Sequence, residues 1–223
     1  MKKIKKHITM EESDVTLISE SDLYIKFGIQ KLLADRKILK QFIKQHSEFK
    51  SSFKPLQYKD CPEIVEQMIN ASTLTYVGPM AAVAGALADS MGIYMKEKGA
   101  QISVIENGGE VFISSVEDIY IALYSMTTIL KGKVGFLFRG KQYDIGLGTS
   151  SGTFGHAISL GKADTVTVFA INAAIGDAAA TRIANEVNGE DIEGSVGKGL
   201  EIADDLENVH GVLISRGKFI GKS

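Results

Sequence analysis

The sequence predicts an α+β fold in which a mainly antiparallel sheet is packed with helices. Five segments with strand-like alternation follow one another in the middle of the chain: 102–106, 111–115, 119–125, 134–138 and 143–147. A strand at 165–171, a helix at 177–187 and a last strand at 212–215 follow them. Because strands and helices do not alternate as in a parallel sheet, the order favours α+β.

The N-terminal third predicts a hairpin and a covering helix. Residues 15–19 and 23–27 alternate on either side of Glu20-Ser21-Asp22, which is typical of a β-hairpin. From Ile29 to Gln45, apolar residues recur at helical spacing and the other face carries Lys and Asp. We expect this helix to cover the sheet.

Two further helices are expected before the central strands. Pro62 predicts the first position of one helix, and Gly78-Pro79 opens another over Met80–Glu97. The first half of the second helix is almost entirely Ala and Gly, so another element must lie very close to it. Close helix packing is the commoner reason for such small residues, and close approach of a ligand is the alternative.

Composition indicates a cytoplasmic protein formed by one domain over residues 1–223. Cys61 is the only cysteine, which excludes an intramolecular disulfide and a cysteine-based zinc site. The Lys-rich N-terminus is not followed by an apolar stretch, and the longest apolar run, 80–88, is far short of the ~20 residues that cross a bilayer. The lysines form a short tail and one helix face without interleaved aromatic residues, so neither membrane nor nucleic acid is an expected partner.

The segment Gly146–His156 is the densest chemical signal, with four glycines and four hydroxyl residues in eleven positions. Exposed backbone N–H groups and hydroxyls are the donors that a phosphate needs. A surface loop that uses Gly and Ser as turn formers would explain the same composition. The spacing matches neither a P-loop nor a Rossmann fingerprint, so neither fold is predicted.

Two other groups of residues could contribute to a ligand site. Asn107-Gly108-Gly109 lies between two apolar strands and predicts a tight hairpin turn, although the same bare backbone could approach a ligand beside Glu106 or Glu110. Asp177 and Thr181 lie one helical turn apart on one face. A carboxylate with a hydroxyl suits Mg²⁺, which takes its other ligands from water and phosphates. The alternative is that Asp177 caps a helix.

His156 and Cys61 are the candidate catalytic residues. His156 could act as a general base or contact a phosphate, or it could be structural, since no Ser-His-Asp pattern can be placed around it. Cys61 directly precedes Pro62, where a helix N-terminus would lower the pKa of a thiol. An unreactive surface thiol is the alternative.

Four separated motifs carry a resemblance that covers nearly the whole chain: 77–86, 106–110, 148–156 and 161–164. In this order they resemble an uncharacterised UPF family of ApbE-like proteins from archaea and anaerobic bacteria. That family looks like a distant branch of the ApbE flavin transferases, which use Mg²⁺ to move FMN from FAD onto a protein threonine. The resemblance therefore implies an ApbE-like fold and a ligand that is a flavin, FAD or FMN, or another phosphate-bearing nucleotide.

The resemblance also implies which residues form the site. Asn107-Gly108-Gly109 resembles the transferase Asn-x-Gly-Gly-Asp turn, Thr149–Gly152 resembles its Thr-Ser-Gly segment, and Asp177 with Thr181 resembles its magnesium-binding Asp-x-x-x-Thr. The implied cofactor-binding residues are Gly78, Asn107, Gly108, Gly109, Thr149, Ser150, Ser151 and Gly152, with Asp177 and Thr181 as the metal pair.

Three positions depart from the transferase pattern. Ala84 stands where the transferases have a lysine, Glu110 replaces an aspartate, and no His-x-x-Asp-Pro segment follows at His156. A Mg²⁺-dependent transferase and a non-catalytic ligand-binding protein both stay open, as do a protein acceptor and a homodimer. The branch has also been connected with sulfide assimilation toward homocysteine, which implies a sulfur-handling or carrier role through Cys61 as the alternative function.

Overall fold

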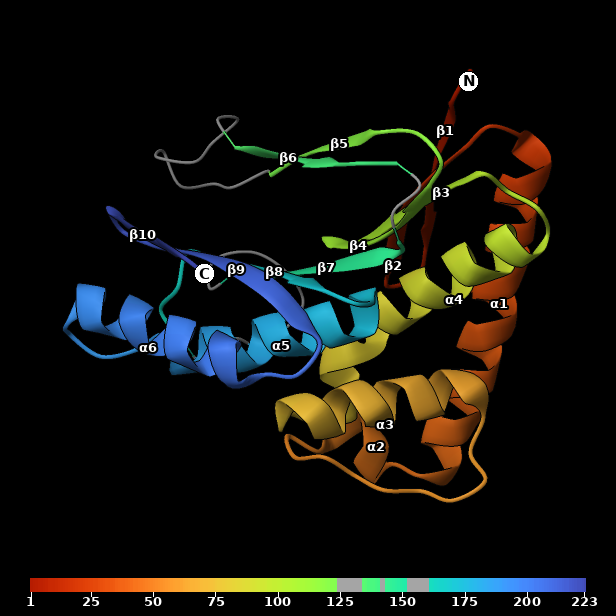
Figure 1. Ribbon diagram of the computed structural model, residues 1–223. Helices are drawn as coiled ribbons and strands as arrows, with labels where there is room; N and C mark the ends of the chain where they lie inside the picture. The colour runs from red at the N-terminus through yellow and green to blue at the C-terminus, as the bar shows by residue number, and fades with distance from the viewer. Residues whose placement is uncertain (124–133, 141–142, 152–160) are drawn as a thin grey trace.

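The computed structural model describes residues 1–123, 134–140, 143–151 and 161–223. Its centre is an eight-stranded sheet in the order β1-β2-β3-β4-β7-β8-β9-β10, with every neighbouring pair antiparallel (Figure 1). The strands are β1 (Ile4–Met10), β2 (Ser13–Ser19), β3 (Ile102–Asn107), β4 (Glu110–Ser115), β7 (Ile145–Ser150), β8 (Thr165–Ala170), β9 (Val209–Arg216) and β10 (Phe219–Lys222). The expected α+β class with a mainly antiparallel sheet is confirmed.

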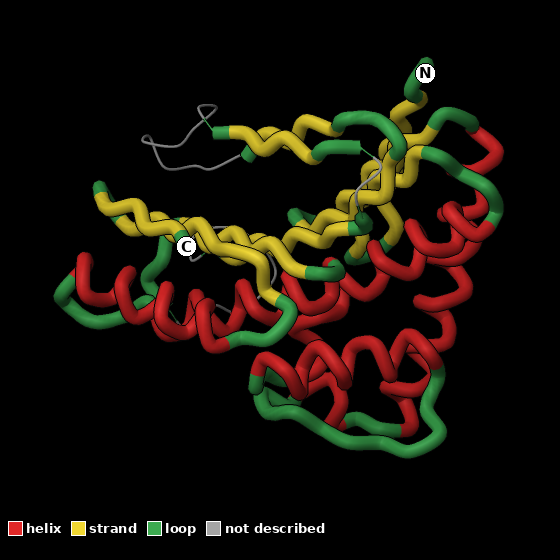
Figure 2. The backbone as a smooth tube through the Cα atoms, in the orientation of Figure 1, coloured by secondary structure: helices red, strands yellow, loops and turns green. Residues whose placement is uncertain are grey.

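The helices lie on one face of this sheet, and a two-stranded sheet of β5 (Ile119–Ala122) and β6 (Gly135–Phe138) lies over the other (Figure 2). The helical segments are α1 (Asp22–Gln45), α2 (Glu48–Ser51), α3 (Glu63–Thr75), the 3-10 turn η1 (Pro79–Ala82), α4 (Val83–Glu97), α5 (Ala173–Glu186) and α6 (Ile192–Asp205). Helices α4, α5 and α6 contact the sheet directly, α1 packs on α4 and also contacts β2, and α3 packs on α5 and η1.

The predicted hairpin at the N-terminus is wrong. Strand β2 pairs instead with β1, and the turn between them lies at Glu11-Glu12. Residues 23–27 belong to α1, because the Ser21 hydroxyl accepts the Leu23 N–H and caps the helix. The Lys-rich tail forms β1, an edge strand whose charged side chains face solvent.

Most other elements lie where the sequence predicts them, with shifted ends. The helix over 29–45 and the central strands are confirmed within the described ranges, whereas α5 begins at Ala173, four residues before the predicted start. Pro62 is the N-cap of α3 rather than its first residue, and the 80–97 helix is divided into η1 and α4. The sequence did not predict α2, α6, β1 or β10.

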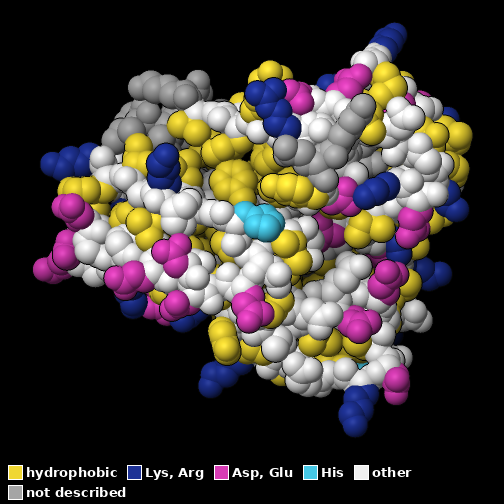
Figure 3. All heavy atoms as spheres, in the orientation of Figure 1, with side chains coloured by type: hydrophobic (Ala, Val, Ile, Leu, Met, Phe, Trp, Pro, Cys, Tyr) yellow, Lys and Arg dark blue, Asp and Glu magenta, His cyan; other side chains and the backbone are white. Residues whose placement is uncertain are grey.

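None of the described helices is by itself long and apolar enough to cross a membrane. Helix α3 and the η1–α4 stretch reach the required length and apolar character only when taken together, and they are bent by 106° relative to each other. Basic side chains are scattered over the face shown in Figure 3 and form no continuous stripe there.

Glycines on β7 allow α5 to lie directly on the sheet. A Cβ at Gly146 would come within 1.9 Å of the Asn172 carbonyl carbon, and one at Gly148 within 2.1 Å of the Gly176 carbonyl carbon. No side chain fits between strand and helix at these positions. Gly146 and Gly148 therefore allow close packing of the helix, whereas the composition of residues 146–156 had suggested phosphate binding.

Helices α4 and α5 cross at their N-termini and cap each other. A Cβ at Gly85 would lie 2.2 Å from the Ala173 oxygen. The Asp89 carboxylate on α4 accepts the N–H groups of Ala173 and Ala174 at 2.7 and 2.8 Å. In return, Asp177 on α5 accepts the Gly85 N–H at 3.0 Å. Each helix thus satisfies first-turn N–H groups of the other.

Replacing Asp89 with Ala should lower the free energy of unfolding by about 2 kcal/mol, because two N–H groups in the protein interior lose their acceptor. Urea unfolding monitored by circular dichroism measures the change. Asp191→Ala removes a cap on the exposed N-terminus of α6 and should cost less. An equal or smaller loss for Asp89→Ala would contradict the structural role of the reciprocal caps.

Stability should also fall as the pH rises from about 4 to about 7. Burial raises the pKa of Asp89 from 3.8 to about 7. Between these values the folded state binds more protons than the unfolded state, so the free energy of unfolding decreases with pH. Asp89→Asn should give a shallower decrease, and Asp204→Asn on the exposed face of α6 should keep the wild-type slope. Denaturant melts at pH 5, 6, 7 and 8 test this, and an unchanged slope in Asp89→Asn would refute it.

Candidate functional site

The candidate site lies at one end of the central strands, where the β3–β4 turn meets β7 and the first turns of α4 and α5. Asn107 and Glu110 are paired across the turn. Gly108 and Gly109 have φ angles of +71° and +119°, which side chains rarely tolerate. The prediction of a tight hairpin turn at Asn107-Gly108-Gly109 is confirmed.

Hydrogen bonds fix this turn against the neighbouring elements. The Asn107 amide is buried and donates to the Ala84 carbonyl at 2.9 Å, which joins the turn to α4. The Gly108 N–H donates to the Asp14 carbonyl, and the Gly109 N–H donates to the Glu106 carboxylate at 3.0 Å. The turn therefore has a defined position relative to the α4 N-terminus.

Asp177 connects the two helices at the site. Besides the Gly85 N–H, its carboxylate accepts the Ala84 N–H. It therefore does cap a helix, but that helix is α4, since α5 is capped by the Asn172 side chain, which accepts the Ile175 N–H. Burial raises the pKa of Asp177 to about 7; these N–H bonds oppose the rise and the charge of Asp89 adds to it. The side chain keeps partial exposure, and Thr181 is half-buried one turn further on.

Glu110 is the second carboxylate of the site. It is 6% exposed and accepts the Thr149 N–H. Burial raises the pKa of Glu110 well above its usual value, and the nearby charge of Asp177 raises it further. The sequence offered Glu110 only as an acceptor beside the turn. Its burial follows from the pairing of β4 with β7, which the local sequence does not reveal.

The end of β7 brings hydroxyl groups to the same region. Thr149 lies beside Glu110, and its Oγ1 is 3.4 Å from the Thr167 Oγ1. Ser150 is half-buried, and the Ser151 hydroxyl donates to the Asp164 carbonyl at 2.8 Å. Gly152 and His156 lie outside the described residues, so their predicted roles in ligand binding and catalysis stay predictions.

Gly78 lies at the start of η1, and packing accounts for it. A Cβ there would come within 1.8 Å of the Ser52 carbonyl oxygen. Within the described segments no hydrogen bond joins Gly78 to the β3–β4 turn or to Asp177. In this structure Gly78 fixes the approach to α4, and its contact with a ligand stays a prediction.

The structure does not favour an activated thiol at Cys61. Cys61 precedes the N-cap of α3 and is not itself the cap. Burial raises the pKa of the Cys61 thiol, and the carboxylates of Glu66 and Asp60 raise it further. At neutral pH the thiol form is favoured, which is the opposite of what nucleophilic sulfur chemistry requires.

The oxygen atoms at the site fit Mg²⁺ better than a metal held entirely by protein. No group of three or more His, Cys, Asp and Glu residues in the described part of the chain is arranged to hold a metal ion. Mg²⁺ needs only one or two carboxylates when water and phosphate complete its shell. Asp177, Glu110 and the Thr181 hydroxyl offer oxygens of this kind.

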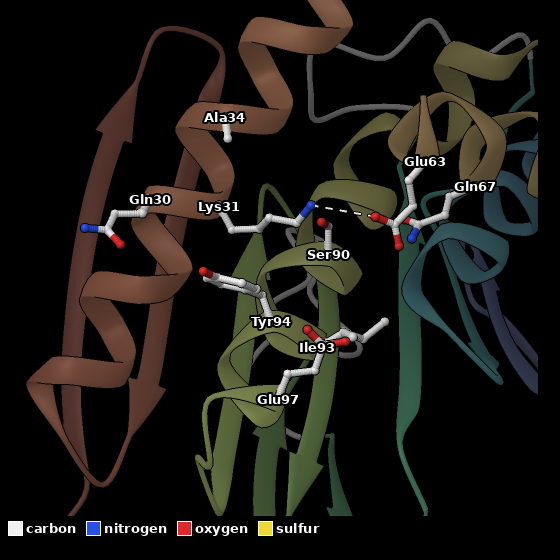
Figure 4. Close-up of a pocket in the computed structure, with 9 residues that line it drawn as sticks. All are labelled: Gln30, Lys31, Ala34, Glu63, Gln67, Ser90, Ile93, Tyr94 and Glu97. Carbon is white, nitrogen blue, oxygen red and sulfur yellow. Dashed lines mark ion pairs between the residues drawn. The ribbon is translucent and has the colours of Figure 1, made fainter. Parts of the chain in front are cut away.

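Two hollows in the described structure lie elsewhere. The larger of the two, of about 510 Å³, is open to solvent and lined by α1, α3 and α4 (Figure 4), and the smaller, of about 220 Å³, lies between β5–β6 and the central sheet. Neither is lined by Asp177, Glu110 or the β3–β4 turn. We place the candidate site at the carboxylates because the converging buried polar groups lie there.

Solved structures share this fold. The flavinyl transferase ApbE of Pseudomonas stutzeri superposes with a TM-score of 0.60 at 13% identity, covering 100% of this chain and 94% of that chain. The flavin transferase ApbE of Vibrio cholerae gives a TM-score of 0.57 at 13% identity, with coverage of 100% and 96%. At this identity the likeness establishes the fold alone.

Relatives of higher identity come from archaea. A UPF0280 protein of Methanothermobacter thermautotrophicus is 41% identical over 193 residues, covering 85% of this chain and 74% of the relative. A UPF0280 protein of Methanocaldococcus jannaschii is 37% identical over 213 residues, with coverage of 94% and 86%. A family profile described as "AbpE bacteria" matches residues 2–212. The chain therefore belongs to the UPF0280 family of ApbE-like proteins.

Proposed function

We propose that the protein binds a flavin nucleotide, FAD or FMN, or another phosphate-bearing nucleotide, together with Mg²⁺, at the site between the β3–β4 turn, the end of β7 and the α4–α5 crossing. The observation that carries this proposal is the pair of carboxylates at Glu110 and Asp177. They come from a strand and a helix, the charge of Asp177 raises the pKa of the buried Glu110, and neither carboxylate forms an ion pair with a basic side chain in the described structure. Such a pair is suited to share a cation.

Asp177 and Thr181 would hold the magnesium ion, with Glu110 beside them. Bound there, Mg²⁺ would neutralise phosphate charge and polarise a phosphoryl oxygen. The residues that position Asp177 are known: the N–H groups of Gly85 and Ala84 orient its carboxylate toward α4. A ligand group that depends on Asp177 would therefore be placed relative to both helices.

A phosphate or the edge of an isoalloxazine ring could approach the surrounding backbone closely. Gly108 and Gly109 carry no side chains, and Thr149 and Ser150 supply hydroxyl donors next to the turn. The solved ApbE proteins are named flavin transferases, which supports a flavin as the first ligand to test.

We propose ligand binding as the function, and transfer of a group from the bound nucleotide would be a further step. The resemblance places Ala84 where the transferases have a lysine, so any transfer would proceed without that cation. The sulfur-handling alternative rests on Cys61, whose raised pKa gives it no support. We therefore do not advance it as a second function.

Asp177→Asn should weaken Mg²⁺-dependent nucleotide binding at least tenfold, because the amide still accepts the α4 N–H groups but no longer offers an anionic oxygen to the metal. Calorimetric titrations with FAD, FMN and ADP, each with and without Mg²⁺, measure the effect. Asp204→Asn is the control, because it removes an exposed carboxylate on α6, a helix that contributes no residue to the site. Equal Mg²⁺-dependent affinities in wild type and Asp177→Asn would refute the metal role.

Iodoacetamide should label Cys61 more slowly than free cysteine at neutral pH, with a labelling midpoint above ~8.5. A labelling series from pH 6 to 10, read by mass spectrometry, gives the midpoint. Cys61→Ser should leave nucleotide binding unchanged. A midpoint below that of free cysteine would show that the thiol is activated and would restore the sulfur-handling hypothesis.

A further inference from the structure

The larger hollow is a separate feature from the nucleotide site. Its lining comes from three helices: Lys31 and Ala34 on α1, Glu63 and Gln67 on α3, and the C-terminal half of α4 (Figure 4). Its lining residues on α4 begin at Ser90, five positions after Gly85, and none of the lining residues belongs to the nucleotide site. With a volume of about 510 Å³ the hollow lies within the size range of small-molecule sites.

The one basic side chain that lines the hollow already has its counter-ion. Lys31 Nζ lies 2.9 Å from an oxygen of Asp35, a buried carboxylate whose other oxygen accepts the Ser90 hydroxyl at 2.5 Å. Because Asp35 balances Lys31, the hollow retains the two negative charges of Glu63 and Glu97.

Neither remaining carboxylate is closely paired. Glu63 is 3.9 Å from Lys31, which is beyond hydrogen-bond distance, and its side chain is 76% exposed. Glu97 has no ion pair in the described structure. In Figure 4 Glu63 lies at the α3 side of the hollow and Glu97 lies beyond Ile93 and Tyr94, toward the other end. Two carboxylates thus flank a partly apolar wall.

The wall also has an unmet hydrogen-bond acceptor. The Gln67 side-chain oxygen is buried and has no hydrogen-bond partner among the described residues. A buried acceptor without a donor is unfavourable, and an N–H group supplied from the hollow would relieve it after a small rotation of the amide. The side chains of Ala34 and Ile93 offer apolar contact between the polar groups.

We propose that this hollow binds a linear aliphatic amine that carries ammonium groups at both ends, a diamine or polyamine. One ammonium group lies against Glu63 and Gln67, the other lies against Glu97, and the methylene chain passes Ala34 and Ile93. This site is independent of the proposed nucleotide site and does not rest on it.

Titration with spermidine at 0.15 M salt tests the proposal, with succinate as the probe of opposite charge. We expect saturable spermidine binding and none of succinate. The double variant Glu63→Gln/Glu97→Gln should bind spermidine at least about fivefold more weakly. Ala34→Phe places a ring in the hollow from an exposed position and should abolish binding without lowering the melting temperature.

Glu66→Gln is the matched control, because Glu66 is an exposed carboxylate on α3 that does not line the hollow. It should bind spermidine as wild type does. Equal weakening in Glu66→Gln and in the double variant would indicate non-specific attraction and overturn the proposal. Absence of saturable binding by wild type at millimolar spermidine, or retained binding in Ala34→Phe, would overturn it as well.

Discussion

The crossing of α4 and α5 is the constraint on which the candidate site depends. The two helices can approach so closely because Gly85 has no side chain where it meets Ala173. Their N-termini then lie side by side, where two positive dipole ends and several unsatisfied N–H groups would be unfavourable together. Asp89 and Asp177 resolve this by exchange, each carboxylate accepting first-turn N–H groups of the opposite helix.

Because of this exchange, Asp177 has a structural role in addition to its position in the candidate site. A carboxylate held by N–H groups of Gly85 and Ala84 has a fixed orientation before any ligand arrives. The β3–β4 turn is tied to the same helical turn through Asn107 and Ala84. Glycine contacts at Gly148 then hold β7 against α5 next to Asp177. The site is thus built by packing between regular elements, and its polar groups come from several parts of the chain.

The sequence predicted features whose cause is local. The Asn107-Gly108-Gly109 turn could be predicted because glycine is the residue best suited to two successive positive φ angles. Prediction from the sequence failed where a residue far along the chain determines the local structure. Gly148 was expected in a loop, but it is a strand residue covered by α5, as is Gly146, which the sequence placed in the strand before it. The burial of Glu110 depends on β4 pairing with β7, across more than thirty intervening residues. At residues 23–27 alternation was misleading, because the capping side chain of Ser21 selects the helix.

The charge balance of the site follows from the residue at position 84. The Ala84 N–H donates to Asp177 and its carbonyl accepts from Asn107, so its backbone lies between the turn and the carboxylate. A lysine at this point, as in the transferases that the sequence resembles, would bring a fixed positive charge close to Asp177 and Glu110. Alanine leaves both carboxylates without a basic partner in the described structure. Burial raises the pKa values of both carboxylates, and the proposed ligand with its magnesium ion would supply the positive charge that the side chain at position 84 does not.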